Sequence, residues 1–344
     1  MNKLTKVGCS ALCGSLAAIS AANAGDLSVT GGVDMSWMSL DDDTTGNPLG
    51  IGSNLTFSGS GELDNGWGVK LTIAELNAGA YSSTAVNIDM LGLGQLNFNQ
   101  GDSGNGIDAF DDKMPTAWEE PWGAGLGTGI QLVRGVGTSP NMQYTTPTIL
   151  GITLTGAMSH DIGGADVNDK GASGDAGGTT GKGYDATINI NPSLGTEILS
   201  GLNLFAGLHG TEITDLDQGD RYEGVAGVTF DLGPISVGYA KSGITTGKED
   251  TKTDVSYYKN NMWGVAFNIN DNLSVSYGFH DSQQGFVNET DQASVLSEVE
   301  SFQIAYTMGG ASIRIAEVEA DNTKYQTGTA FDKDATVISV SLAF

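Results

Sequence analysis

The chain has 344 residues, 51 of them glycine, and its 41 Asp and Glu outnumber its 15 Lys and Arg, which gives a formal net charge of -26 at pH 7. A chain this acidic is a poor partner for nucleic acid, because phosphate binding requires Lys and Arg. With 8% aromatic and only 16% charged residues it is not a disordered polyanion, and with 7 prolines and no three-residue glycine period it is not collagen.

The first 24 residues have the features of a secretory signal. Basic residues at the start precede an apolar stretch over 7–19, and Ala22-Asn23-Ala24 supplies the small residues that a signal peptidase reads. We therefore predict a signal peptide over 1–24 and a mature chain over 25–344. Both cysteines of the chain lie in the signal peptide, so the mature chain is expected to have no thiol.

The mature chain has a hydrophobic period of two. Apolar residues alternate with small or polar residues over 263–269, 273–279, 302–308 and 338–344. Successive side chains of a strand point to opposite faces, so each segment is predicted to be a strand with one apolar face. No run of 18 apolar residues occurs, and we expect no transmembrane helix.

The predicted strands are joined by connections that alternate between short and long. Turn-forming residues mark the short ones at 64–66, 91–94, 233–234, 271–272 and 309–310. Longer polar stretches occupy 41–50, 77–84, 100–129, 160–183, 214–221, 243–253, 282–297 and 321–333. These breaks indicate about sixteen strands, although 192–201 is longer than the short turn expected at that place.

Two all-β architectures fit this pattern. A soluble sandwich would bury the apolar faces in a core, whereas a transmembrane barrel would turn them toward lipid and the polar faces toward a lumen. The signal, the even strand number and the alternating connections favour the barrel, which also leaves no strand edge unpaired in lipid. We predict a 16-stranded antiparallel transmembrane β-barrel over 25–344.

Four stretches resemble the Gram-negative general diffusion porins. They are the first strand at 26–34, the segment Pro115-Thr116-Ala117-Trp118-Glu119-Glu120, the segment Tyr144-Thr145-Thr146-Pro147 with Gly151, and a last strand that ends in Phe344. The resemblance implies an outer-membrane homotrimer with a third loop folded into each pore. It also implies that the insertion machinery of the outer membrane recognises the C-terminal strand. Expected partners are outer-membrane lipid, lipopolysaccharide and small hydrophilic solutes.

The third loop corresponds to residues 100–129, and its acidic residues are the candidates for a pore constriction. It holds one cation, Lys113, and six carboxylates, at Asp102, Asp108, Asp111, Asp112, Glu119 and Glu120. Carboxylates around a constriction raise the local concentration of cations and disfavour anions. The alternative is a solvated outer loop with no role in filtering.

The resemblance also implies basic residues on the pore wall opposite this loop, and the chain offers few. Lys70 and Arg314 each lie between apolar residues, so alternation places both on the lumen face. Arg134 begins the segment that leads to Tyr144, but glycines and a proline between the two interrupt the alternation. Because so little positive charge opposes the loop, we predict a preference for cations.

Acidic clusters in other outer loops are candidate sites for Ca2+ or Mg2+. They lie at Asp41-Asp42-Asp43, at 161–175, and at Asp215, Asp217 and Asp220. None has the spacing of a twelve-residue calcium loop, so solvated surface charge is the simpler interpretation. The alternative is that divalent ions bridge these loops to lipopolysaccharide.

No catalytic, cofactor or zinc site is predicted. The three histidines, His160, His209 and His280, are far apart in the sequence, and no Ser-His-Asp set or nucleotide-binding glycine motif is evident. We expect a water-filled channel for passive diffusion. A solute-specific channel is the first alternative, and a barrel enzyme or adhesin is the second.

Overall fold

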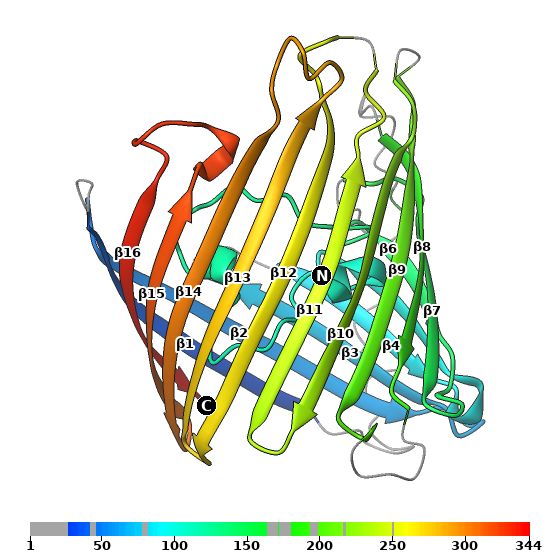
Figure 1. The fold of residues 1–344 in the computed structure, drawn as a ribbon. Coiled ribbons are helices and arrows are strands. Elements are labelled where there is room, and N and C mark those ends of the chain that lie inside the picture. Colours follow the sequence, from blue (N-terminus) through cyan, green and yellow to red (C-terminus); the bar gives the residue numbers. More distant parts are fainter. Residues whose placement is uncertain are drawn as a thin grey trace, which may run out of the picture.

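The described residues form one closed β-barrel. The computed structural model describes residues 27–41, 46–77, 82–163, 171, 180–192, 199–215, 218–249 and 251–344. Sixteen antiparallel strands pair with their sequence neighbours, and β1 closes the barrel against β16 (Figure 1). The predicted fold class is confirmed. The predicted signal peptide lies outside the described residues.

The strands differ in length around the barrel. Their bounds are β1 (Leu27–Leu40), β2 (Leu49–Glu62), β3 (Gly68–Leu76), β4 (Ser83–Asp89), β5 (Gln95–Gln100), β6 (Asn141–Thr145), β7 (Ile152–Ser159), β8 (Thr180–Ile190), β9 (Leu202–Ile213), β10 (Arg221–Leu232), β11 (Ile235–Thr245), β12 (Val255–Asn270), β13 (Leu273–Phe286), β14 (Val295–Met308), β15 (Ala311–Asp321) and β16 (Lys333–Ala343). Strands β3 to β6 are the short side, and the strands from β12 to β14 are the tall side.

Short turns at one end alternate with longer loops at the other, as predicted. The connection between β5 and β6, hereafter L3, covers 101–140 and is therefore longer than the predicted 100–129. The difference arises at 130–140, which pairs with no strand. Positive φ angles at Gly135 and Gly137, 54° and 44°, are incompatible with an extended strand there.

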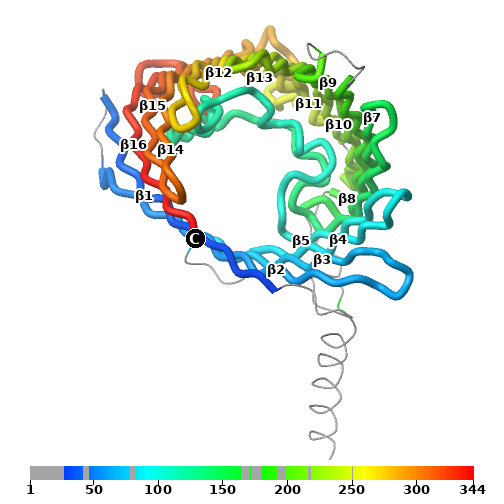
Figure 2. The backbone as a smooth tube through the Cα atoms, turned by 90° about the horizontal axis from the view of Figure 1, so that it is seen from below, coloured from blue at the N-terminus to red at the C-terminus, as the bar shows by residue number. Residues whose placement is uncertain are grey.

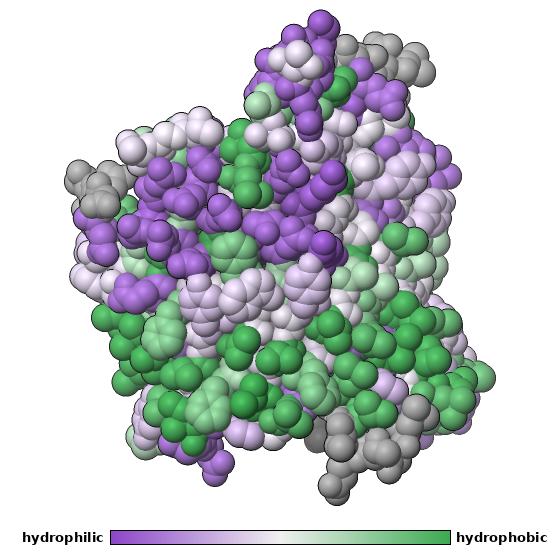
Figure 3. Space-filling view, in the orientation of Figure 1, coloured by the Kyte–Doolittle hydropathy of each residue, from purple (hydrophilic) through white to green (hydrophobic). Residues whose placement is uncertain are grey.

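The two faces of the sheet have different chemistry. Trp263, Val265 and Phe267 alternate along β12 and are exposed on the outside, where lipid would cover them. Figure 3 shows apolar residues gathered in the lower part of the outer surface, with hydrophilic residues above them. Three acidic residues of the outer wall, Glu300, Glu319 and Asp334, lie side by side on β14, β15 and β16.

The apolar core lies between L3 and the inner wall. L3 contains the short 3-10 helices η2 (Gly106–Phe110) and η3 (Pro121–Gly123). Around η2, one buried cluster joins loop and wall residues, namely Ile107, Phe110, Met114 and Val133 of L3 with Phe205, Val225, Ala240, Ile244 and Met262 of the wall. A second cluster places Ala124 and Leu126 of L3 against β14, β15 and β16. Within the described residues, no helix is long and apolar enough to span a membrane.

Candidate pore constriction

L3 folds into the barrel and follows its inner wall. Viewed along the barrel axis, the loop passes inside the strands from β8 round to β14 and leaves the space beside β1 to β5 open (Figure 2). The apolar clusters described above hold its buried side against the wall. The other side of the loop therefore forms part of the pore lining.

Hydrogen bonds fasten the middle of L3 to β13 and β14. The backbone N–H of Ala117 donates to Ser276 Oγ at 2.8 Å. The side chain of Gln303 accepts from the N–H groups of Trp118 and Glu119 at 3.2 and 3.0 Å, and its amide donates to the Glu119 carbonyl at 2.6 Å. These contacts fix the segment Pro115–Glu120, one of the four stretches that resemble the general porins.

The last part of L3, residues 130–140, is its return leg, and the tall side of the barrel holds it. The N–H of Gln131 donates to the Tyr325 hydroxyl at 2.8 Å, and Asn260 Nδ2 donates to the Gln131 carbonyl at 3.0 Å. Tyr325 belongs to η5 (Thr323–Tyr325) in the loop between β15 and β16. An outer loop and a wall strand therefore position the same residue of L3.

L3 borders a cavity of about 660 Å3 whose lining carries both signs of charge. The charged side chains and one aromatic ring in this lining are Asp108, Asp111, Asp112, Lys113, Arg134 and Trp122. Asp108 Oδ2 accepts a hydrogen bond from the Gly104 N–H at 2.7 Å. In the part of the chain that the structure describes, Asp111 and Asp112 form no ion pair, and Asp112 is exposed in this lining, so its charge acts on the pore.

The predicted acidic residues do not form one group. Glu120 is 5% exposed and turns back into the loop, where it accepts from Met114 N at 2.7 Å and from Trp122 Nε1 at 2.9 Å. Asp102 and Glu119 are exposed but do not border the cavity of Asp108. Glu119 instead lines a second cavity, of about 490 Å3, together with Trp118 and Arg314.

Burial alters the protonation of several L3 acids. Desolvation raises the pKa of Asp111 to about 8, and the neighbouring carboxylates of Asp108 and Asp112 add to the rise. Desolvation raises the pKa of Glu120 to about 7 against the opposing effect of its two hydrogen-bond donors. Desolvation inside the lumen also raises the pKa of Asp108 and, against the lowering effect of the nearby Arg314 guanidinium, that of Glu119. The negative charge of L3 therefore depends on pH near neutrality.

Lys70 lies on the lumen face, as alternation predicts. It pairs with Asn87 of β4, which in turn pairs with Asn97 of β5. Asn97 Nδ2 lies 3.5 Å from Oδ1 of Asn105 in L3, so this row of side chains faces the lumen. Lys70 is exposed there, on the side of the barrel that L3 leaves open.

The two arginines lie beside L3 rather than opposite to it. Arg314 is on the lumen side of β15, with Nη1 3.3 Å from Asp34 Oδ1 and its guanidinium 5.7 Å from the Trp118 ring centre. Arg134 is in the return leg of L3 and lines the cavity of Asp108, so its expected place on a wall strand is wrong. The reason is the backbone at 130–140, which runs along the inner wall past β10 and β8 before β6 begins.

Sequence reasoning missed two wall carboxylates. Asp185 on β8 and Glu223 on β10 are each 5% exposed and accept hydrogen bonds from the backbone of L3. Alternation with Thr187 and Asn189 could have placed Asp185 on the lumen face. It could not have shown that a loop about 50 to 80 residues earlier covers it.

The architecture is that of an outer-membrane channel, a closed barrel with a polar lumen that an inward loop narrows. A sequence profile of the Gram-negative porins matches residues 8–272. The chain therefore belongs to the Gram-negative porin family and is a porin of the outer membrane, as the sequence predicted. No curated protein matches its sequence.

Solved structures of porins share the fold at very low sequence identity. OmpF of Salmonella typhi, solved with daunomycin, aligns with a TM-score of 0.69 and 9% identity over 93% of this chain and 98% of that one. An anion-selective porin from Comamonas acidovorans has a TM-score of 0.65 and 13% identity, over 93% and 100% of the two chains. The channel DcaP of Acinetobacter baumannii aligns with a TM-score of 0.65 and 11% identity over 93% of this chain and 98% of that one. These likenesses concern the fold.

Proposed function

We propose that this porin passes small hydrophilic solutes and ions by passive diffusion and prefers cations. The observation that carries the proposal is the charge of L3. Between residues 101 and 140 this loop holds six carboxylates and only two bases, Lys113 and Arg134. With Asp111 and Glu120 protonated near neutral pH, the remaining acids still outnumber the bases. An excess of negative charge at the narrowest part of a pore attracts cations.

The fold by itself does not decide the sign of this preference, because an anion-selective porin has the same fold. The test is a reversal potential measured across a planar bilayer in a KCl gradient. The expected sign is that of a channel more permeable to K+ than to Cl−. The opposite sign would contradict the proposal.

The same recording separates a general porin from a solute-specific channel. Candidate solutes are added to one side while single channels are followed in constant salt. Conductance steps that no solute blocks support passive diffusion without a specific site. Saturable block by one class of solute would instead support the solute-specific alternative, for which the pairing of Trp118 with Arg314 offers a place to begin.

We further propose that the protein is a homotrimer in which another copy covers the outer face of β1 to β5. Apart from Glu75, the outward positions of β1 to β5 are uncharged. The acids and lysines of the outer wall belong to later strands, such as Lys241, Lys259, Glu300 and Glu319. Charged residues are depleted in the core of a protein interface, so an uncharged face along the full strand height favours contact with another copy. Lipid contact alone would require apolar residues only in a band at mid-height.

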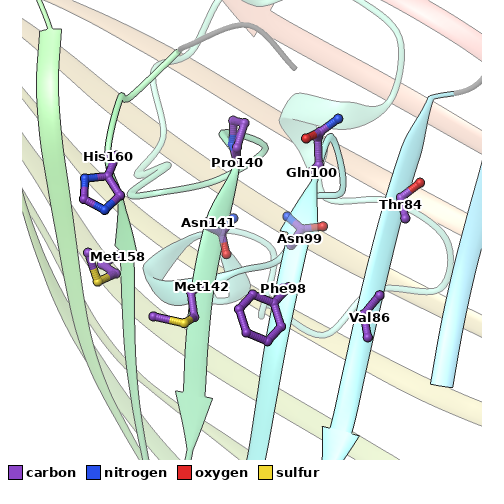
Figure 4. A pocket seen from close by; sticks show the side chains of 10 residues that line it. All are labelled: Thr84, Val86, Phe98, Asn99, Gln100, Pro140, Asn141, Met142, Met158 and His160. Atoms are coloured by element: carbon purple, nitrogen blue, oxygen red, sulfur yellow. The ribbon is translucent and has the colours of Figure 1, made fainter. Parts of the chain in front are cut away.

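A hollow that begins on this face and extends over β4 to β7 supports the contact. It has a volume of about 550 Å3, and Val86, Phe98, Met142 and Met158 contribute its apolar lining (Figure 4). Light scattering of the detergent-solubilised protein, corrected for bound detergent, should give the mass of three chains. The mass of one chain would contradict the trimer.

For the acidic outer loops we propose solvated surface charge, with divalent-ion bridges to lipopolysaccharide as the alternative. Among the described residues, no three His, Cys, Asp or Glu side chains are placed to hold a metal ion, but most of these loop clusters lies outside that part of the chain. In outer-membrane vesicles, a chelator should lower the temperature at which the barrel unfolds if the bridges exist. An unchanged temperature would exclude them.

A further inference from the structure

A buried chain of polar side chains links β8 and β9 beneath L3. Asp185 Oδ1 is bonded to His209 Nδ1, and His209 Nε2 is bonded to Thr211 Oγ1. The residue types resemble those of a nucleophilic catalytic set. However, the three residues are only 2–5% exposed, so no solute reaches the Thr211 hydroxyl. The remaining oxygen of Asp185 shows a different role.

Asp185 holds both legs of L3. Its Oδ2 accepts from the N–H of Ile107 on the outgoing leg at 2.8 Å and from the N–H of Val136 on the return leg at 3.2 Å. Hydrogen bonds to an ionised carboxylate are stronger than those between neutral groups. One wall side chain therefore ties together two loop segments that have no strand pairing of their own.

Glu223 on β10 repeats this arrangement one strand further. Its Oε2 accepts from the N–H groups of Arg134 and Gly135 at 2.6 and 3.1 Å. Its other oxygen, Oε1, binds Arg221 Nε at 2.8 Å. Glu223 lies directly beside His209 in the register of β9 and β10, so the two carboxylates belong to one cluster.

The loop has glycine at the positions where it approaches Asp185 most closely. Gly106 and Gly135 have φ angles of 58° and 54°. A Cβ atom on them would lie 1.7 and 2.3 Å from Asp185 Oδ2. Both conditions exclude a side chain. The sequence of L3 is therefore matched to the wall carboxylate, and this match is independent of the hydrogen bonds.

We propose that Asp185 and Glu223 form a clasp that positions L3 and thereby sets the size and ion preference of the pore. The proposal rests on the proposed function only in that L3 lines the conducting path. The clasped groups lie next to pore charges, since Ile107 precedes Asp108 and Arg134 is itself clasped. Both residues act through L3, so they are positioning residues and touch no solute.

The clasp is tested with Asp185→Ala and Glu223→Gln in single-channel recordings. Without a carboxylate, the legs of L3 move, so the noise of the open-channel current should rise several-fold, the mean conductance should change and the reversal potential should shift. The matched control is Asp231→Asn. Asp231 lies on the same face of β10 as Glu223, and its substitution removes the same charge. Its carboxylate accepts a hydrogen bond from Ser236 of β11 instead of from L3.

A disulfide can replace the clasp in the Asp185→Ala protein. A Cβ built on Gly207 of β9 lies 3.5 Å from the Ile107 Cβ, within the range of a disulfide. In the variant Asp185→Ala, Ile107→Cys, Gly207→Cys, oxidation should return the current noise to the unaltered level, and reduction should raise it again. Folding is checked by the mobility of unheated protein on a gel.

Unaltered noise, conductance and reversal potential in both Asp185→Ala and Glu223→Gln would overturn the clasp. If Asp185→Ala does not assemble, Glu223→Gln alone decides, because it keeps the side-chain volume, removes the charge and replaces one of the two acceptor oxygens with an NH2 donor. An unaltered channel that prefers anions and whose two variants are noisy would contradict the cation preference and still support the clasp. A noisy variant of a cation-preferring channel supports both.

Discussion

Individual carboxylates of L3 differ in their surroundings, although the sequence presents them as one acidic loop. Asp112 is exposed in the lining of the pore cavity, whereas Glu120 is buried and bonded to two donors of its own loop. The first is a pore charge, and the second holds the loop together. Substitutions at the two positions should therefore have different consequences.

Cation preference should increase from pH 6 to pH 9. The pKa of Asp111 is raised to about 8 and that of Glu120 to about 7, so both are protonated at pH 6 and lose their protons over this range. Each loss adds one negative charge to L3. Reversal potentials measured in one salt gradient at several pH values test this. In Asp111→Asn the change above pH 7.5 should be smaller, and a pH-independent potential in the unaltered protein would refute the assignment.

Glu120→Ala should destabilise the protein, and Glu119→Ala should not. The first substitution leaves the Met114 N–H and the Trp122 indole N–H without their acceptor, which costs about 1–3 kcal/mol for a buried donor. The side chain of Glu119 is exposed, so its removal changes only the charge. Thermal unfolding in detergent measures the difference, and equal transition temperatures would contradict it.

At the scale of elements, L3 and the wall strands are fitted to each other by small residues. Gly264 on β12 and Gly278 on β13 lie where the loop passes close to the wall, and a Cβ on them would be 2.6 Å from the Pro115 carbonyl oxygen and 2.9 Å from Pro121 Cγ. The loop therefore lies against the wall instead of across the lumen. The diameter of the pore depends on these contacts as much as on the number of strands.

Gly264→Val should lower the single-channel conductance. The new side chain cannot occupy the space of the Pro115 carbonyl and the Met114 side chain, so L3 must shift toward the lumen. The control is Ala266→Val, two residues further on the same face, which adds apolar volume at a residue that is partly exposed instead of buried against L3. Equal conductance in the two variants would show that L3 tolerates the added side chain in place.

At the scale of the whole molecule, the barrel depends on the pairing of its first and last strands. β1 pairs with β16 from Leu40 opposite Ala335 to Gly32 opposite Ala343. Beyond that, the backbone of Phe344 exchanges two 2.9 Å hydrogen bonds with Gly31. The Phe344 ring is 79% exposed on the outside, where a partner can contact it.

Deletion of Phe344 should reduce the amount of folded porin in the outer membrane more than Phe344→Tyr does. The deletion removes the exposed aromatic ring and the last pair of hydrogen bonds, whereas tyrosine keeps both. Quantifying unheated, folded protein in outer-membrane fractions tests this. Equal amounts from the deletion and from the tyrosine variant would contradict a role of the C-terminal residue in assembly.

Local pattern explains how much of this protein could be predicted. The two-residue period of 263–269 and 273–279 matches β12 and β13, because alternation determines which side chains share a face. The same argument placed Lys70 on the lumen face. It could not be applied to Arg134, where glycines and a proline interrupt the alternation and hydrogen bonds to a distant strand fix the backbone.

The sequence by itself determined the barrel, its strand number and the acidic excess of L3, because these depend on periodicity and composition. Only the tertiary structure decided which carboxylates face the pore, where the arginines lie, and what holds the loop. Asp185 meets Ile107 across 78 positions of the chain, and Gln303 meets Trp118 across 185. Contacts at such separations depend on the closed barrel, which brings β8 and β14 to opposite ends of one loop.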